Sequence, residues 1–164
     1  IVPNKAKHPA PDFETVLQQH RGIIFKVARL YTRNEADFED LVQDISIQIW
    51  QSLGNYKPAY ALSTWLYRIA LNVSIDRLRR EERSQRRQEV FEALPHTGQP
   101  GQPSGRSEQL HRWVQVLPPL ERALMLLYLE DYPHEEIGEM LGISKSNVGT
   151  KISRLKQRLK KELK

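Results

Sequence analysis

Apolar residues recur along this chain at helical spacing. The clearest stretch runs from residue 35 to residue 53, where the regularly spaced apolar positions are Phe38, Leu41, Val42, Ile45, Ile49 and Leu53. At about 100° per residue these side chains fall on one narrow stripe, the core face of an amphipathic helix. Helical patterns also fill residues 12–94 and 108–163, and no alternating run is long enough for a strand. The pattern therefore predicts an all-α protein.

N-cap residues mark where the helices of the N-terminal half begin. The expected N-caps are Asp12, Asn34 and Ser63, for helices that end near Tyr31, Leu53 and Arg83. Asp37, near the start of the second helix, is favoured there by the helix dipole. Between the second and third helices, residues 54–62 form a loop that carries Tyr56 and Tyr60.

The C-terminal half carries the pattern of a helix-turn-helix. Residues 118–119, both proline, begin one helix that runs to Tyr132, and Pro133 begins a short helix over residues 134–141. Gly138 is small where the two helices of such a motif cross closely. Gly142 permits the tight turn that follows, because the position after a helix end commonly needs a positive φ.

The last helix follows this turn and has a polar outer face. Ser144 is its expected N-cap, and its buried stripe consists of Val148, Ile152, Leu155 and Leu159. The outward side chains near its N-terminus are Lys145, Ser146, Asn147, Thr150, Lys151 and Arg154. A recognition helix places such side chains in the major groove, where asparagine pairs with adenine and lysine or arginine with guanine. These features favour a DNA-binding motif over a plain helical hairpin.

A proline- and glycine-rich segment separates the two halves. Residues 95–107, PHTGQPGQPSGRS, contain three prolines and three glycines and almost nothing to bury. We therefore expect two small helical domains, residues 1–94 and 108–164, joined by a flexible linker over residues 95–107.

One apolar residue interrupts a polar outer face in the N-terminal half. Ile47 lies opposite the core stripe of its helix, among polar residues, with Trp50 at the edge. This placement indicates a docking surface for a protein partner, and a stray exposed apolar residue would give the same pattern.

The third helix has a second polar stripe. Arg68, Asn72 and Arg79 share one face, with Ile75 among them, beside the aromatic loop of residues 54–62. Cations, an amide and rings in this arrangement suit single-stranded or partly melted nucleic acid. A solvated surface around a core tryptophan is the alternative.

Positive charge is concentrated at the C-terminal end. The chain carries a formal net charge of +5, whereas residues 145–164 alone carry +7 and the remainder −2. Charge runs are most often solvated faces, but a concentrated basic helix is also the footprint of a polyanionic partner. Its coincidence with the expected recognition helix favours DNA.

Composition argues against several other classes of protein. The chain has no cysteine, so it lacks a disulfide framework and thiolate metal ligands. The five histidines are scattered, and no nucleophile or phosphate-loop motif occurs. No apolar run approaches the ~18 residues that span a bilayer, and residues 1–11 do not read as a signal peptide. We expect a cytoplasmic protein that is no enzyme and takes no cofactor or metal.

Three stretches resemble the bacterial RNA polymerase sigma factors of the extracytoplasmic-function (ECF) group. Residues 37–53, DFEDLVQDISIQIWQSL, are similar to the region 2 helix that docks on the clamp of core RNA polymerase. Residues 63–80, STWLYRIALNVSIDRLRR, resemble the region 2 helix that engages the −10 promoter element. Residues 117–163 resemble region 4, which binds the −35 element. The resemblance covers nearly the whole chain after residue 12, in the same order.

The resemblance implies a role for individual residues. The polymerase-docking residues would be Asp40, Gln43, Asp44, Ile47 and Trp50. Capture of a flipped −10 base would fall to Asn72 and the loop with Tyr56 and Tyr60, and the nearby DNA backbone to Arg68, Arg77, Arg79 and Arg80. The −35 element would be read or held by Asn147, Thr150, Lys151 and Arg154. Gly149 and Ser153 stand where many members carry larger residues, so the promoter sequence is not implied.

The expected function is that of a transcription initiation factor that directs core RNA polymerase to promoters and helps open the DNA. The resemblance also implies an anti-sigma factor as a partner, often membrane-bound, which would hold the protein at the inner membrane. The main alternative is a stand-alone regulator with the same helix-turn-helix and an N-terminal sensor domain. A metal-dependent hydrolase is a more distant alternative, because no cluster of ligands supports it.

Overall fold

The structure is a computed structural model that describes residues 11–89 and 105–163. Its elements are α1 (Phe13–Leu30), α2 (Glu35–Ser52), the 3₁₀-helix η1 (Leu53–Asn55), α3 (Leu62–Glu89), α4 (Arg106–Gln115), α5 (Pro119–Leu129), α6 (His134–Leu141) and α7 (Lys145–Glu162). All regular structure in these ranges is helical, which confirms the all-α prediction. None of the helices described is long and apolar enough to cross a membrane. Most of the predicted linker lies outside the described residues, but α4 already begins within it, at Arg106.

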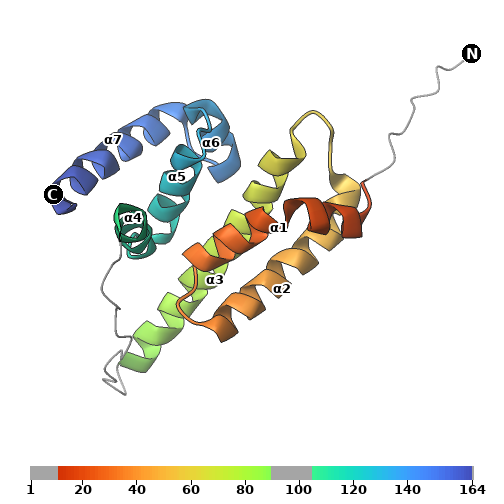
Figure 1. Ribbon diagram of the computed structural model, residues 1–164, viewed down its shortest axis with the longest axis horizontal. Coiled ribbons are helices and arrows are strands. Elements are labelled where there is room, and N and C mark those ends of the chain that lie inside the picture. Colours follow the sequence, from red (N-terminus) through yellow and green to blue (C-terminus); the bar gives the residue numbers. More distant parts are fainter. Residues whose placement is uncertain (1–10, 90–104, 164) are drawn as a thin grey trace, which may run out of the picture.

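α1, α2 and α3 pack together as a bundle (Figure 1). The Asp12 carboxylate caps α1 by accepting a hydrogen bond from the Thr15 backbone N–H at 3.2 Å. The Asn34 side chain caps α2 in the same way, accepting from the Asp37 N–H at 2.8 Å. Both predicted caps are thereby confirmed. The predicted core stripe of α2 is buried at Phe38, Leu41, Ile45, Ile49 and Leu53, with Val42 partly buried.

α3 differs from the predicted helix at both ends. Ser63 is not the N-cap, because α3 begins one residue before it. The Trp65 N–H instead donates to the Ala61 carbonyl at 3.2 Å, so the first turn is closed from Ala61. At the other end α3 continues past Arg83 to Glu89. The added residues include arginine, glutamine and glutamate, which are good helix formers, and no glycine or proline interrupts them.

α5 is buried on several sides and ends earlier than predicted. It packs against α6 and α7 and also against α3. Its fully or nearly fully buried apolar side chains are Ala123, Leu124, Met125, Leu126 and Leu127. The predicted helix runs to Tyr132, but the observed helix stops at Leu129, because Asp131 adopts a left-handed conformation with φ of 61°.

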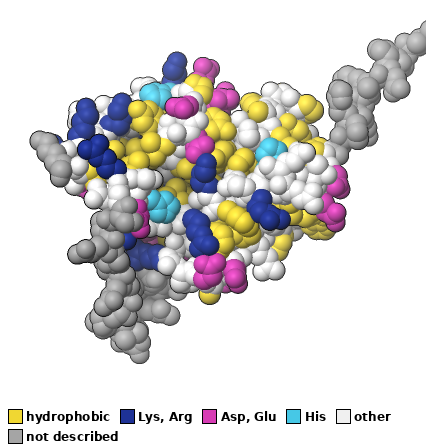
Figure 2. Space-filling model, in the orientation of Figure 1, with side chains coloured by type: hydrophobic (Ala, Val, Ile, Leu, Met, Phe, Trp, Pro, Cys, Tyr) yellow, Lys and Arg dark blue, Asp and Glu magenta, His cyan; other side chains and the backbone are white. Residues whose placement is uncertain are grey.

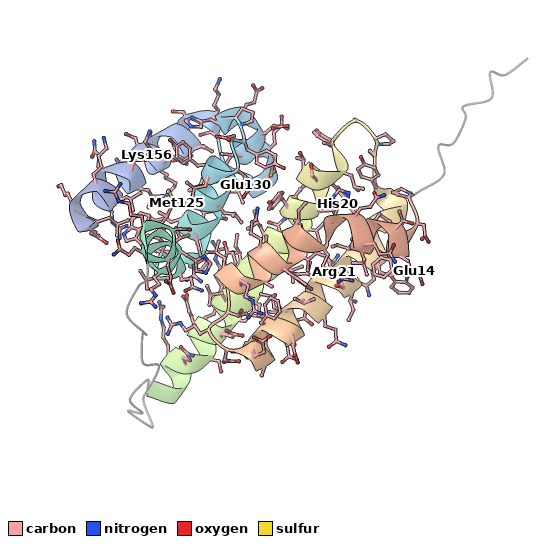
Figure 3. The ribbon with its side chains drawn as sticks, viewed as in Figure 1. Glu14, His20, Arg21, Met125, Glu130 and Lys156 are labelled. Atoms are coloured by element: carbon pink, nitrogen blue, oxygen red, sulfur yellow. The ribbon has the colours of Figure 1, made fainter. Side chains whose placement is uncertain are left out.

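The two halves pack against each other along a contact that we call the seam, between α1 and α3 on one side and α4, α5 and α6 on the other (Figure 1). The ammonium of Lys26 on α1 lies 2.7 Å from a carboxylate oxygen of Glu130, the residue after α5, which is labelled in Figure 3. Beside this ion pair, the ring of Tyr67 meets the ring of Tyr132 edge to face, with centroids 5.7 Å apart. The seam therefore combines an ion pair with aromatic packing.

A buried cation occupies the centre of the seam. The Arg122 guanidinium donates from Nη1 to the Leu30 carbonyl at 3.0 Å and from Nη2 to the Leu117 carbonyl at 2.9 Å. It also lies 5.1 Å from the ring centroid of Tyr31, whose hydroxyl donates to the Pro119 carbonyl at 2.8 Å. Burial lowers the pKa of Arg122, yet an arginine stays charged at neutral pH. The centre of the seam is therefore held by buried hydrogen bonds to backbone carbonyls as well as by apolar packing.

Stability is expected to fall at alkaline pH because of two groups in the seam. Burial raises the pKa of Tyr31, and the hydrogen bond with Glu130 raises the pKa of Lys26. The folded chain keeps both protons at a pH where the unfolded chain, with pKa values near 10, releases them. The free energy of unfolding should therefore fall as pH rises above about 10.

A Tyr31→Phe variant should lessen this fall, because phenylalanine carries no proton to release. The measurement is urea unfolding at about pH 8 and about pH 11 for both proteins. An equal loss of stability in the variant and the wild type would contradict the role of Tyr31.

Candidate docking face and nucleic-acid interface

The predicted docking residues lie together on the outer side of α2. Asp40, Gln43 and Asp44 are all exposed. Ile47 keeps 47% and Trp50 keeps 63% of its surface exposed, which is high for large apolar side chains. The spacing of three and four residues brings them onto one face of the helix. We call this surface, Asp40 to Trp50 on the outer side of α2, the docking face.

Arg77 of α3 is turned toward this face. Its guanidinium lies 3.3 Å from a carboxylate oxygen of Asp44 and 3.9 Å from one of Asp40. It also lies 3.8 Å from Asp37 and 3.0 Å from Glu81, and its side chain is only 18% exposed. The structure thus places Arg77, which the resemblance assigns to DNA, among carboxylates beside the docking face. One cation among four acidic side chains leaves the cluster with a net negative charge.

The predicted −10 residues line the start and the outer face of α3. The Tyr56 hydroxyl donates to the Tyr60 carbonyl at 2.6 Å, and the Tyr56 ring lies 5.3 Å from that of Trp65. These contacts leave Tyr60 52% exposed. The further exposed residues are Arg68, Asn72, Arg79 and Arg80. We call the surface formed by Tyr56, Tyr60, Arg68, Asn72, Arg79 and Arg80 the −10 surface.

Ile75, which the pattern placed on the same stripe, is buried at 6% exposure. α3 contacts α1, α2, α5 and α6, so it buries more of its circumference than a helix with one core face. The −10 surface therefore excludes Ile75 and is narrower than the stripe that the sequence pattern predicts.

The helix-turn-helix has the predicted geometry. A Cβ built on Gly138 would lie 2.6 Å from the Ile143 carbonyl oxygen, so only glycine fits this crossing. Gly142 has a φ of 71°, in the left-handed region that glycine favours. The Ser144 hydroxyl then caps α7 by accepting from the Asn147 N–H at 3.1 Å. All three predictions are confirmed.

The outer face of α7 is open to solvent near its N-terminus. Lys145, Ser146, Asn147, Thr150 and Arg154 are exposed, and Lys151 is partly exposed. Cationic side chains gather on the part of the molecule where α7 lies (Figure 2). Near the other end of α7, Arg158 lies 3.4 Å from Glu121 and 3.9 Å from Glu162, so its charge is already partnered.

The sequence patterns did not predict two groups of residues, Arg122 in the seam and the carboxylates around Arg77. Arg122 could have been noticed, because it interrupts the apolar run of residues 120–127 and a buried arginine needs hydrogen-bond acceptors. Arg77 and Glu81 are visible as a pair four residues apart, but nothing local indicates that Asp44 completes the cluster. Among the residues that the structure describes, no group of three or more potential ligands could hold a metal ion.

Two family models match this chain, one in each half. Sigma-70 region 2 matches residues 16–84, which include α2 and most of α3. Sigma-70 region 4 matches residues 107–159, which include α5, α6 and most of α7. The two matches follow each other in the order that the sequence motifs predict.

Curated relatives agree with these matches. The ECF RNA polymerase sigma factor SigE of Mycolicibacterium smegmatis is 30% identical over 162 residues, covering 92% of this chain and 61% of SigE. The RNA polymerase sigma factor CarQ of Myxococcus xanthus is 30% identical over 139 residues, covering 80% of this chain and 78% of CarQ. This chain belongs to the ECF sigma factors. As a sigma factor it acts in transcription initiation, and the match of its N-terminal half to region 2 does not favour a stand-alone regulator.

Solved structures of sigma factors share the fold of this sigma factor. RpoE from Bartonella quintana, solved in complex with the anti-sigma factor NepR, gives a TM-score of 0.73 at 20% identity, over 93% of this chain and 96% of that one. CnrH, solved in complex with the cytosolic domain of CnrY, gives a TM-score of 0.63 at 24% identity, over 92% of this chain and 86% of that one. The likeness extends over both halves.

Proposed function

We propose that this sigma factor binds core RNA polymerase through the docking face of α2, captures the −10 element with the −10 surface and reads the −35 element with α7. The observation that carries the proposal is the exposure of Ile47 and Trp50 in the half that matches region 2. Two large apolar side chains exposed to water on one helix face do not stabilise the free protein, so their exposure indicates a surface that binds a protein partner.

The chemistry of the docking face suits a partner with an apolar pocket and a basic rim. Ile47 and Trp50 supply apolar area at the centre, of the kind that dominates interface energetics. Asp40 and Asp44 flank them, and Arg77 fixes the direction of both carboxylates without neutralising the cluster. Charge complementarity at the rim would then set the orientation of the partner.

The −10 surface suits an unstacked base more than an intact duplex. Extruding a base costs roughly a few kcal/mol, which contacts in a pocket must offset. Tyr60 offers an exposed ring, Asn72 an amide for a base edge, and Arg68 a cation for the backbone. No chemical step falls to this chain, and phosphodiester bond formation belongs to the polymerase.

In the −35 interface, Asn147 and Lys160 should behave differently on substitution. Asn147→Ala removes an amide near the N-terminus of α7 and should cost about 1–2 kcal/mol at one base pair, with relaxed preference there. Lys160→Ala, near the C-terminal end of α7, should weaken binding to all duplexes alike and lower the salt slope by about 1. Both are measured by titration on a duplex that the wild type selects from a randomised pool. Equal loss of sequence preference in the two variants would contradict the assignment.

We further propose an anti-sigma factor as a partner, and the bacterial cytoplasm as the place of action. RpoE, which shares this fold, was solved with the anti-sigma factor NepR, and CnrH, which also shares it, with the cytosolic domain of CnrY. A membrane-bound partner would hold this sigma factor at the inner membrane. The division into residues 1–94, 95–107 and 108–164 also stays a proposal, supported by family matches that end at residue 84 and resume at residue 107.

Co-elution with core RNA polymerase on a sizing column tests the proposed function. A stable complex of the wild-type chain with the core enzyme is the expected result. Binding to duplex DNA without any complex with the core enzyme would overturn the proposal in favour of a stand-alone regulator.

A further inference from the structure

Arg77 points away from the side chains that are proposed to hold −10 DNA. Arg68, Asn72 and Arg79 share one stripe of α3. Arg77 is nine residues from Arg68, which places it about 180° away around the helix, and five residues from Asn72, about 140° away. Its guanidinium lies against α2 instead, and only 18% of the side chain is exposed. Arg77 is therefore not part of the stripe that faces the DNA in the proposed function.

Carboxylates from two helices surround the Arg77 guanidinium. α2 supplies Asp37, Asp40 and Asp44, whose spacing of three and four residues puts them on one face of the helix. α3 supplies Glu81, which accepts a hydrogen bond from Nε at 3.0 Å. Nη1 donates to Asp44 at 3.3 Å, and Nη2 lies 3.8 Å from Asp37 and 3.9 Å from Asp40. Each guanidinium nitrogen faces a carboxylate, so a phosphate would have to displace one to reach it.

We propose that Arg77 is a positioning residue of the docking face and not a contact to DNA, and that it holds Asp40 and Asp44 in the direction in which they meet core RNA polymerase. This inference rests on the proposed function, since it takes the docking face as the polymerase site. It replaces the contact to the DNA backbone that the resemblance implies for Arg77.

The two aspartates need a cation to keep their direction. Like charges one turn apart on a helix repel each other, and exposed side chains lose conformational entropy when a partner has to order them. A guanidinium can hold several carboxylates at fixed angles because its donors form a planar fork, whereas lysine is a point charge on a flexible stem. Asp40 keeps 69% and Asp44 keeps 55% of its side chain exposed, so both can reach a partner while Arg77 holds them.

Substitutions of Arg77 test this role in titrations of the labelled chain with core RNA polymerase. Arg77→Met removes the charge at similar side-chain length and should weaken the complex about tenfold. Charge alone predicts the opposite, because the docking face becomes more negative toward a basic partner. Arg77→Lys keeps the charge but loses the planar fork, and should weaken the complex about threefold. Thermal unfolding checks that each variant is folded at the temperature of the titration.

A double-mutant cycle shows whether Arg77 acts through Asp44, the aspartate to which it donates a hydrogen bond. In an Asp44→Ala background, Arg77→Met should weaken the complex only about threefold, because one of the two positioned carboxylates is already absent. If Arg77 merely joined α2 to α3 for stability, the loss would be about tenfold in both backgrounds.

Arg79→Met is the matched control for DNA binding, because Arg79 is exposed and lies on the stripe of Arg68. Each variant is saturated with core polymerase and titrated with promoter DNA that the wild-type complex selects from a randomised pool. Arg79→Met should weaken DNA binding and lower its salt slope by about 1, with core affinity within about twofold of the wild type. Arg77→Met should leave both the DNA affinity of the saturated complex and its salt slope unchanged.

Three results would overturn the role of Arg77. The first is unchanged or tighter binding of core polymerase by both Arg77 variants, and the second is an equal loss in the Asp44→Ala background. The third is a loss of DNA affinity in Arg77→Met as large as in Arg79→Met. An Ile47→Glu variant separates this inference from the docking proposal. If it loses the complex while the Arg77 variants keep it, docking stands and only the role of Arg77 fails, whereas a normal complex with Ile47→Glu contradicts the docking face itself.

Discussion

An Ile47→Glu variant is expected to lose its complex with core RNA polymerase while it keeps its fold. Ile47 is 47% exposed and lies outside the core stripe of α2, so the substitution should change the free energy of unfolding by no more than about 0.5 kcal/mol. At the centre of an interface, the same substitution removes apolar contact and buries a charge. We expect a loss of about 2–4 kcal/mol of binding free energy, or at least about 30-fold in Kd.

Gln48→Glu is the matched control, because it adds the same charge at the next, exposed position of α2, about 100° away around the helix. It should bind the core enzyme within about threefold of the wild type, since it lies beside the docking face and not on it. Kd values come from titration of labelled protein with core polymerase, and thermal unfolding checks the fold. Equal weakening by the two variants would show a general effect of charge and would remove Ile47 from the interface.

Local rules predicted those parts of the fold that residues close in sequence decide. The caps at Asp12, Asn34 and Ser144 each satisfy an N–H three residues further along. The turn at Gly142 needs a left-handed backbone conformation, which glycine adopts without steric cost, so the glycine itself predicts the turn. The same rules placed Ile47 outside the core, because helical periodicity needs no knowledge of the neighbouring helices.

Contacts between distant segments could not be predicted in this way. An apolar stripe along a helix predicts a single buried face. It does not show that both halves of the chain cover α3, so the burial of Ile75 and Tyr67 is not predicted. Lys26 and Glu130 are ordinary surface charges until the fold brings them together over 104 residues. The role of Arg77 depends likewise on α2, because its identity as an arginine fits a phosphate as well as a carboxylate. The roles of individual residues in polymerase docking and DNA binding remain predictions, made from the resemblance to ECF sigma factors.

Gly138→Ala is expected to destabilise the C-terminal half by about 2–3 kcal/mol, because the added methyl group overfills a tight crossing. Its Cβ would lie 2.6 Å from the Ile143 carbonyl oxygen and 3.5 Å from the Lys145 nitrogen, which are backbone atoms of the turn. A backbone atom cannot rotate away as a flexible side chain can, so the turn itself must shift. Because the turn sets the angle between α6 and α7, duplex DNA binding should weaken together with stability. Urea unfolding and duplex titration measure the two effects.

Gly22→Ala makes the same chemical change with the opposite expected sign. Gly22 lies within α1, and a Cβ there would meet no heavy atom within 4 Å. Alanine should therefore stabilise the chain by about 0.5–1 kcal/mol, through higher helix propensity and a less flexible unfolded state. If Gly138→Ala lowers the free energy of unfolding and Gly22→Ala raises it, glycine is required where α6 meets the turn and not in helices generally. Stabilisation by both would show that the turn moves freely, and the orientation of α7 would then have to be held by its buried stripe of Val148, Ile152 and Leu155 alone.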